Sequence, residues 1–329
     1  MAGKIKRYRD SYMLILIVAA LFLLFAFTTP TFARFSNLMA VLQKCVELGL
    51  LSIGMTVCII SGGVNLSTAA LCSLNTVVIA VLTVNCNVPI ALSVMASLVV
   101  SLLCGMLNGY LIAYLNVAPM LATLGTQSLF SGLGLVLTKG GAISGLPIGY
   151  TMIGNAKIGG VFPVQIFILV AAALAVGFFT SKTAEGRKLF LVGTNPVVAT
   201  FSGIRSARSV LLAYVVSSIM SFLAAVVISS RLASGRPDVA DAFLMQSIAA
   251  SILGGASVTG GKGSIGNCML SVLVFCILSN GLVQLLPTNA TFIENLILGS
   301  LLIALLTWKA VNPQKFRATS VIDTATTPS

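Results

Sequence analysis

Histidine is absent from the chain, and acidic residues are scarce. Among 329 residues there are 7 Asp or Glu, and charged residues make up only 8% of the sequence. The acidic residues are scattered, and none of the 7 cysteines has a partner at Cys-x-x-Cys spacing. Zinc sites, haem sites and a clustered catalytic centre are therefore unsupported, so we expect no enzyme activity, no cofactor and no metal.

Apolar residues make up 57% of the chain, and the mean hydropathy is +1.07. A soluble globular domain carries a charged fraction about three times higher than this one. The sequence predicts an all-α, polytopic membrane protein, with about ten apolar runs able to cross a hydrocarbon core of roughly 30 Å. These runs are centred on residues 12–29, 38–61, 66–84, 90–115, 119–137, 163–180, 210–230, 243–258, 265–286 and 293–311.

The ends of the chain belong to the same single transmembrane domain, residues 1–329. Four basic residues precede the first run, but no small-residue cleavage site follows Thr29-Pro30, so we interpret this run as a retained span and not as a signal peptide. Residues 312–329 are expected to form a flexible tail.

Basic residues predict the orientation. With ten crossings and a cytosolic N-terminus, the inner segments (1–11, 181–208, 259–263 and the tail) hold 13 of the 19 Lys and Arg. This bias predicts that both termini are cytosolic. The net charge of +12 is then mostly a topological signal, and nucleic-acid binding is a poor interpretation because the cations are not interleaved with aromatic stacking residues.

Residues 181–208 form a hydrophilic loop inside this apolar chain. Asn195 suits a helix N-cap, Pro196 the first helical position and Gly203 a left-handed C-terminal cap, which together predict a two-turn helix. It would expose Val197, Val198 and Phe201, and it is too short to be stable alone in water. We expect it to dock into a soluble partner.

The alternative for this helix is contact with membrane lipid. The helix would then lie on the headgroups, with nearby basic side chains facing phosphates. Those side chains are Arg187, Lys188, Arg205 and Arg208.

Glycine pairs occur at the ends of two spans. Gly62-Gly63 and Gly254-Gly255 are each followed by alternating apolar and small polar residues, which is a weak internal repeat. Such glycines indicate either irregular backbone beside a solute cavity or ordinary interhelical loops.

A run at 256–264 resembles a phosphate-binding loop, but Ala256 and Gly263 replace residues that such a loop requires. We interpret the run as a tight turn between closely packed helices. The glycines assigned to packing there are Gly254, Gly255, Gly260 and Gly261.

Uncharged polar residues within the spans suit a neutral polyhydroxylated solute, although many of them can simply bind neighbouring helices. The candidate pathway residues are Asn65, Ser67, Asn75, Asn108, Thr123, Thr126, Gln127 and Gln246. Charged residues at membrane depth are few: Lys44 and Glu47, which can pair on one helix face, and Glu294. A pathway this poor in acids indicates that the driving energy enters elsewhere, and the 181–208 loop is the plausible entry point. An ion-coupled secondary transporter or a channel without an ATPase is the alternative.

Four motifs resemble those of the sugar-type ABC importer permeases, which include transporters for ribose, galactose, xylose and furanose signalling molecules. The motifs are Ser61–Ser67 (SGGVNLS), Asn108-Gly109 with Pro119–Thr126, the loop from Gly186-Arg187 to Gly203-Ile204, and Ile248–Gly255 followed by Gly260–Gly263. The resemblance covers about residues 12–310.

The resemblance implies a permease in the bacterial inner membrane that forms a homodimer or heterodimer. Its partners would be cytosolic ATP-binding subunits and an extracytoplasmic solute-binding protein. The loop helix would be the coupling helix that enters an ATPase groove. The coupling residues implied are Arg187, Asn195, Pro196, Ala199, Phe201 and Gly203.

The sequence departs from the family pattern at three places. Asn65 stands where the family usually has Asp, Thr68-Ala69-Ala70 replace Val-Gly-Ser, and the segment 242–246 lacks the usual Glu and Asp. These departures bear on the identity of the solute.

Overall fold

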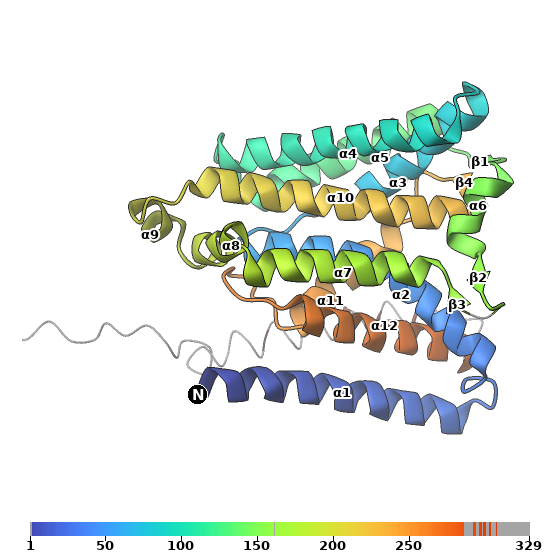
Figure 1. Cartoon of the computed structure of the whole chain (residues 1–329), viewed down its shortest axis with the longest axis horizontal. Helices are drawn as coiled ribbons and strands as arrows, with labels where there is room; N and C mark the ends of the chain where they lie inside the picture. Colours follow the sequence, from blue (N-terminus) through green and yellow to red (C-terminus); the bar gives the residue numbers. More distant parts are fainter. Residues whose placement is uncertain are drawn as a thin grey trace, which may run out of the picture.

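The computed structural model describes residues 2–160, 162–285 and a few helical positions between 292 and 307. Within this part the chain is a bundle of long helices lying side by side (Figure 1). The long helices are α1 (Ala2–Thr28), α2 (Phe35–Ile60), α4 (Ile90–Ala113), α5 (Pro119–Thr138), α7 (Gln165–Lys182), α10 (Ser206–Leu232) and α12 (Ile265–Leu285). The shorter helices are α3 (Thr68–Ala80), continued by a π-helical turn (Val81–Asn85), α6 (Ile148–Asn155), α8 (Ala184–Thr194), α9 (Pro196–Phe201) and α11 (Asp241–Leu253).

The all-α membrane class is confirmed, whereas the number of spans differs from the expected ten. Eight segments of the described chain are long and apolar enough to cross a membrane: the seven long helices and α3 with its π-helical turn. The eighth expected span, 243–258, is instead α11, whose 13 residues rise only about 20 Å. The tenth, 293–311, lies largely outside the described residues, as do Glu294 and the tail 312–329.

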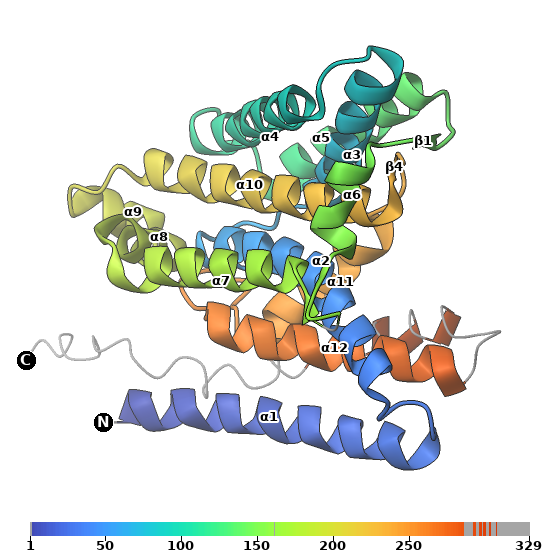
Figure 2. The same cartoon turned by 45° about the vertical axis from the view of Figure 1, so that its right-hand side comes forward.

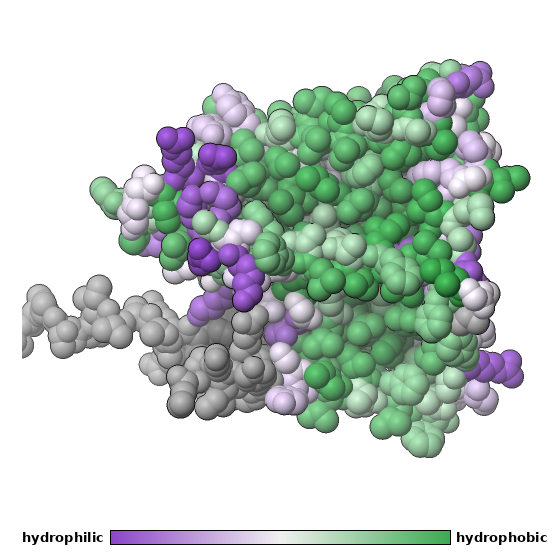
Figure 3. Space-filling view, viewed as in Figure 1, coloured by the Kyte–Doolittle hydropathy of each residue, from purple (hydrophilic) through white to green (hydrophobic). Residues whose placement is uncertain are grey.

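The centre of the bundle is built on α2 and α10. Helix α10 packs on α2, α3 and α4, and α2 packs on α7, α11 and α12. Leu50, Ile53 and Ile228 are fully buried there. Outer helices turn large apolar side chains outward instead, for example Leu103 on α4 and Phe178 on α7. The surface is accordingly an apolar band between two more polar ends, as expected for a protein surrounded by lipid (Figure 3).

The two ends of the band differ. At one end lie α8, α9 and the start of α1, and we call it the α9 end (Figures 1 and 2). At the opposite end, called the α6 end, lie α6 and two small antiparallel pairings. These are β1 (Ile143–Ser144) with β4 (Ser234–Gly235), and β2 (Lys157–Ile158) with β3 (Phe162–Pro163).

Helix α6 is held against the end of α10 by Tyr150. Its hydroxyl lies 2.7 Å from Ser229 Oγ and donates to the Val226 carbonyl at 3.2 Å. Burial raises the pKa of Tyr150 to about 12, so this phenol stays neutral at physiological pH. The α6 end is thereby fixed to the bundle through hydrogen bonds of an uncharged group.

Candidate functional site

The helix predicted in the 181–208 loop is α9. The Asn195 Oδ1 accepts the backbone N–H of Val197 at 3.0 Å and that of Val198 at 3.1 Å. Gly203 has φ +76°, and its N–H donates to the Thr200 carbonyl. The predicted N-cap, first-turn proline and glycine C-cap are all confirmed as structure.

Helix α9 projects beyond every other labelled helix at its end of the bundle (Figures 1 and 2). Phe201 is 89% exposed, Val197 61% and Val198 58%, whereas Ala199 is buried against the bundle. Three large apolar groups thus point away from the protein on an element that is itself too short to be stable alone.

Helix α8, which precedes α9, was not predicted. The Thr183 Oγ1 caps it by accepting the Gly186 N–H at 3.0 Å. Leu189 and Val192 are buried and Gly186 lies too close to α7 to accommodate a side chain. The Thr183 cap followed by apolar residues at helical spacing was the available signal. The exposed Arg187 of α8 donates from its guanidinium group to the Lys182 carbonyl at the end of α7, at 3.2 Å.

The junction between α8 and the bundle is centred on Gly193. A Cβ atom at this position would overlap the Ile60 carbonyl oxygen and lie 2.6 Å from the Gly261 nitrogen. The Gly261 N–H itself donates to the Ile60 carbonyl at 2.9 Å. Likewise, a Cβ atom at Gly260 would overlap the Gly193 carbonyl oxygen. Main-chain atoms of three segments therefore meet here, and glycine is required because any side chain at Gly193 or Gly260 would overlap a neighbouring main chain.

Two of these segments are helix breaks of the same kind. We call residues 61–67 the first break and residues 254–264 the second break. Gly62 and Gly255 both have positive φ, +95° and +90°, and each donates its N–H three residues back. The next residue in each break donates five residues back, to Cys58 and Ser251 respectively. Both breaks are Schellman caps.

This geometry corrects the register of the sequence repeat. Gly62 corresponds to Gly255, and not to Gly254 as the aligned glycine pairs suggested. Gly254 has a different role, because a Cβ there would lie 2.7 Å from the Cys268 Cα, so it permits close packing of α11 on α12. Similar glycine pairs therefore arise from two different requirements.

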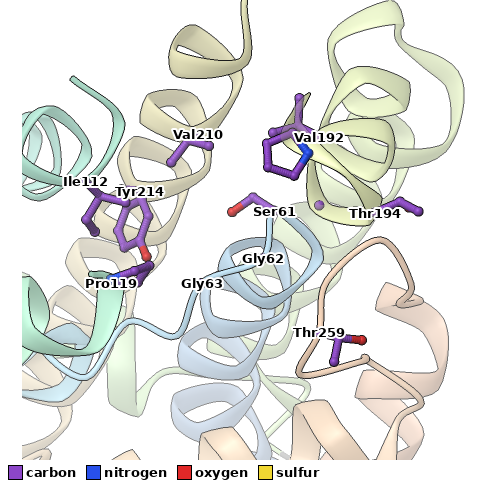
Figure 4. A pocket seen from close by; sticks show the side chains of 12 residues that line it. Ser61, Gly62, Gly63, Ile112, Pro119, Val192, Thr194, Val210, Tyr214 and Thr259 are labelled. Atoms are coloured by element: carbon purple, nitrogen blue, oxygen red, sulfur yellow. The ribbon is translucent and has the colours of Figure 1, made fainter. Parts of the chain in front are cut away.

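A cavity of about 300 Å³ lies beside the Gly193 junction (Figure 4). It lies where residues of α8 and α9 face residues of α4, α5 and α10. Its lining residues are Ser61, Gly62, Gly63, Ile112, Pro119, Val192, Gly193, Thr194, Pro196, Val210, Tyr214 and Thr259. The ring of Tyr214 is buried, and its hydroxyl has no hydrogen-bond partner among the described residues. A Cβ at Gly63 would overlap this hydroxyl, so the first break passes directly over it.

Most candidate pathway residues lie in the interior and bind one another. The Ser67 hydroxyl donates to Asn65 Oδ1 at 2.8 Å and accepts from Asn108 Nδ2 at 2.8 Å. Asn108 in turn accepts from Thr126 Oγ1 at 2.7 Å, and Asn65 Nδ2 donates to Ser217 Oγ at 3.1 Å. This chain of bonds ties the first break to α4, α5 and α10.

A second group surrounds Asn75. Its side chain accepts from Ser97 Oγ at 3.0 Å and donates to Ser101 Oγ at 3.3 Å, and Ser101 donates to the Ser218 carbonyl. Thr123 caps the first break from α5 by donating to the Val64 carbonyl at 3.2 Å. These side chains join helices across the interior in the manner expected of polar groups in lipid.

Two candidates lie outside these groups. Gln127 on α5 and Gln246 on α11 are each partly exposed. The structure therefore places six candidates in the interior, with Asn75 in a separate group, and leaves two nearer the surface. Their role in a solute pathway stays a prediction.

The buried acidic residue Glu47 pairs with Arg231, and not with Lys44 as its spacing suggested. Arg231 Nε donates to Glu47 Oε1, which joins α2 to the end of α10, whereas Lys44 is exposed. Since 184 positions separate the two partners, helical spacing could not reveal this pair. The charge of the buried Glu47 carboxylate is thus balanced by Arg231 within the described part of the chain.

A family match over most of the chain establishes which proteins it is related to. Residues 37–306 match the family described as the branched-chain amino acid transport system permease component. The chain belongs to this permease family. The resemblance inferred from its motifs is confirmed, and the protein is a multi-pass membrane permease.

Two relatives illustrate the family. Over 281 residues this permease is 34% identical to the ribose import permease protein RbsC of Bacillus subtilis strain 168, covering 85% of this chain and 84% of that protein. It is 32% identical over 271 residues to the autoinducer 2 import system permease protein LsrD of Escherichia coli strain K12, covering 80% and 81%. No solved structure matches the chain.

Proposed function

We propose that this permease is the membrane-spanning subunit of an ATP-driven importer for a sugar or a sugar-like small polar solute. The relatives named for ribose and autoinducer 2 import support this solute class. So do the interior Asn, Ser and Thr side chains, which can donate to and accept from hydroxyl groups. The protein would form a homodimer or heterodimer in the bacterial inner membrane, with an extracytoplasmic binding protein supplying the solute.

The observation that carries the proposal is the exposed, capped helix α9. Its Val197, Val198 and Phe201 side chains offer an apolar anchor of the kind that enters a groove on a partner. Its position beyond α8 supports docking to a protein over lying flat on the membrane surface (Figure 1). The partner would be a cytosolic ATP-binding subunit, and the α9 end would be cytosolic.

Movement of α9 would reach the bundle through the Gly193 junction. Because Gly193 touches the main chain of both breaks, displacement of α8 and α9 bears directly on α2 and on the loop before α12. The adjacent cavity leaves room for such a displacement. ATP binding and hydrolysis would thereby shift the bundle between inward-open and outward-open states.

Phe201→Glu tests this assignment. A carboxylate in an apolar groove costs several kcal/mol, so we expect capture of the ATP-binding subunit and solute uptake both to fall at least tenfold, or about 1.4 kcal/mol. Ile148→Glu is the matched control, because Ile148 is 84% exposed at the α6 end. It should leave capture of the ATP-binding subunit unchanged.

Normal capture and normal uptake by Phe201→Glu would contradict the role of α9. Solute transport by the purified permease alone in liposomes, driven by an ion gradient, would instead favour the ion-coupled alternative.

A further inference from the structure

A second cavity, of about 250 Å³, lies at the α9 end between α8 and the first turn of α10. It is separate from the cavity beside Gly193. Its lining residues are Glu185, Lys188, Gly203, Arg205, Arg208 and Ser209. Unlike the apolar flanks of the bundle, this cavity is lined by charged and polar groups, and its chemistry therefore points to a charged ligand.

The charges of this cavity do not cancel. Lys188 Nζ lies 2.6 Å from Glu185 Oε1, so these two groups neutralise each other. The guanidinium groups of Arg205 and Arg208 have no hydrogen-bond or ion-pair partner among the described residues. The cavity thus carries two uncompensated cations and favours an anion.

The start of α10 adds further donors. Its N-cap, Arg205, makes no side-chain capping bond, so the first-turn N–H groups of Ala207 and Arg208 remain open. Ser209 is only 2% exposed, it lines the cavity, and its hydroxyl makes no hydrogen bond to another described residue, so it can donate to a ligand held there. Two exposed guanidinium groups, the open N–H groups of a helix N-terminus and the Ser209 hydroxyl thus line one cavity, and each of them can donate a hydrogen bond to an anion.

A phosphate group fits these donors best. Guanidinium groups bind phosphate oxygens through paired, charge-assisted hydrogen bonds, and helix N-termini favour the same ligand. The hydrophilic cluster at α8 and the start of α10 borders the apolar band directly, with α7 alongside (Figures 1 and 3). On α7 an exposed apolar row leads along the band: Phe167, Val170, Leu174 and Phe178. Acyl chains can lie on such a row while their headgroup reaches the cavity.

We propose that this cavity binds the phosphate of an anionic phospholipid and so bridges α8 and α10. These two helices flank α9, and a headgroup held by both would restrict the movement of α9 relative to the bundle. The site does not depend on which solute is carried or on whether an ATP-binding subunit docks to α9. Lipid binding and transport can accordingly be tested apart.

The test measures lipid retention by the purified full chain, using native mass spectrometry with phosphatidylglycerol and phosphatidylcholine. The native protein should retain phosphatidylglycerol preferentially, and Arg205→Gln/Arg208→Gln should reduce that retention about tenfold or more. Ser209→Ala should weaken it less. Lys182→Gln and Lys157→Gln, combined, remove two exposed cations outside the cavity and provide the matched control, which should retain phosphatidylglycerol within about twofold of the native level.

Four results would overturn the proposal. Equal retention of both lipids by the native chain would remove the anion preference, and equal losses in the double variant and its control would remove the site. Displacement by inorganic phosphate, with no dependence on the lipid supplied, would assign the cavity to a free phosphate. Unchanged lipid retention with lost capture of the ATP-binding subunit would assign it to a protein partner.

Discussion

The two helix breaks have the same type of cap, but the chain takes a different course after each cap. Beyond its cap, the first break turns back into the interior, where its residues Asn65 and Ser67 bind α10 and α4 through hydrogen bonds. Beyond its cap, the second break forms a turn whose Gly260 and Gly261 contact Gly193 near the end of α8. A Schellman cap therefore fixes only where a helix ends. The contacts of the residues that follow the cap decide whether the break is anchored in the interior or joined to α8.

The largest effect is expected where both breaks meet. Gly193→Ala would drive its Cβ into main-chain atoms of Ile60 and Gly261, which cannot rotate away. We expect a loss of about 3 kcal/mol or more in stability, measured by thermal unfolding in detergent. Gly177→Ala on α7 is the control, because no atom lies within 4 Å of its Cβ position. It should change stability by no more than about 1 kcal/mol, in the stabilising direction.

A stability loss of intermediate size is expected at the first break, which is anchored in the interior. Gly63→Ala would overlap the Tyr214 hydroxyl and lie 3.2 Å from the Pro119 Cβ, costing about 2 kcal/mol. Tyr214→Phe removes a buried hydroxyl that has no described partner, so alone it should stabilise the protein by about 1 kcal/mol. The double variant should recover much of the Gly63→Ala loss, because the overlapping atom is gone. Strict additivity in this cycle would show that the first break does not rest on Tyr214.

The smallest effect is expected in the second break. No atom lies within 4 Å of a Cβ at Gly255, so Gly255→Ala incurs only the conformational cost of φ +90°, about 1 kcal/mol. Gly255→Asn should cost less, since asparagine tolerates a left-handed backbone better. A loss as large as that of Gly193→Ala would mean that Gly255 is packed as tightly as Gly193.

Local chemistry made much of the α9 region predictable. The cap residues Asn195, Pro196 and Gly203 lie within nine positions of one another, so their geometry follows from neighbouring residues alone. Span boundaries were harder, because hydropathy continues through Gly254 to Val258 while the helix stops at Leu253. Backbone capping bonds end that helix at Leu253, and a hydropathy average cannot detect such bonds.

Long-range pairings could not be predicted from the sequence. The Glu47–Arg231 pair and the Gly193 contact with Ile60 each join positions more than a hundred residues apart. The polar interior presents a related difficulty. Asn108 suits a solute pathway and an interhelical bond equally well, and only its placement beside Ser67 and Thr126 reveals the bonds that it makes.

The Gly193 junction has a consequence for how such permeases diversify. Its contacts are made by peptide groups, which every amino acid possesses, whereas the proposed pathway residues would recognise a solute through their side chains. Substitutions that alter cargo preference can therefore accumulate without disturbing this joint, provided that the glycines remain. If α9 is moved by an ATP-binding subunit as proposed, the same junction would serve permeases for many imported compounds.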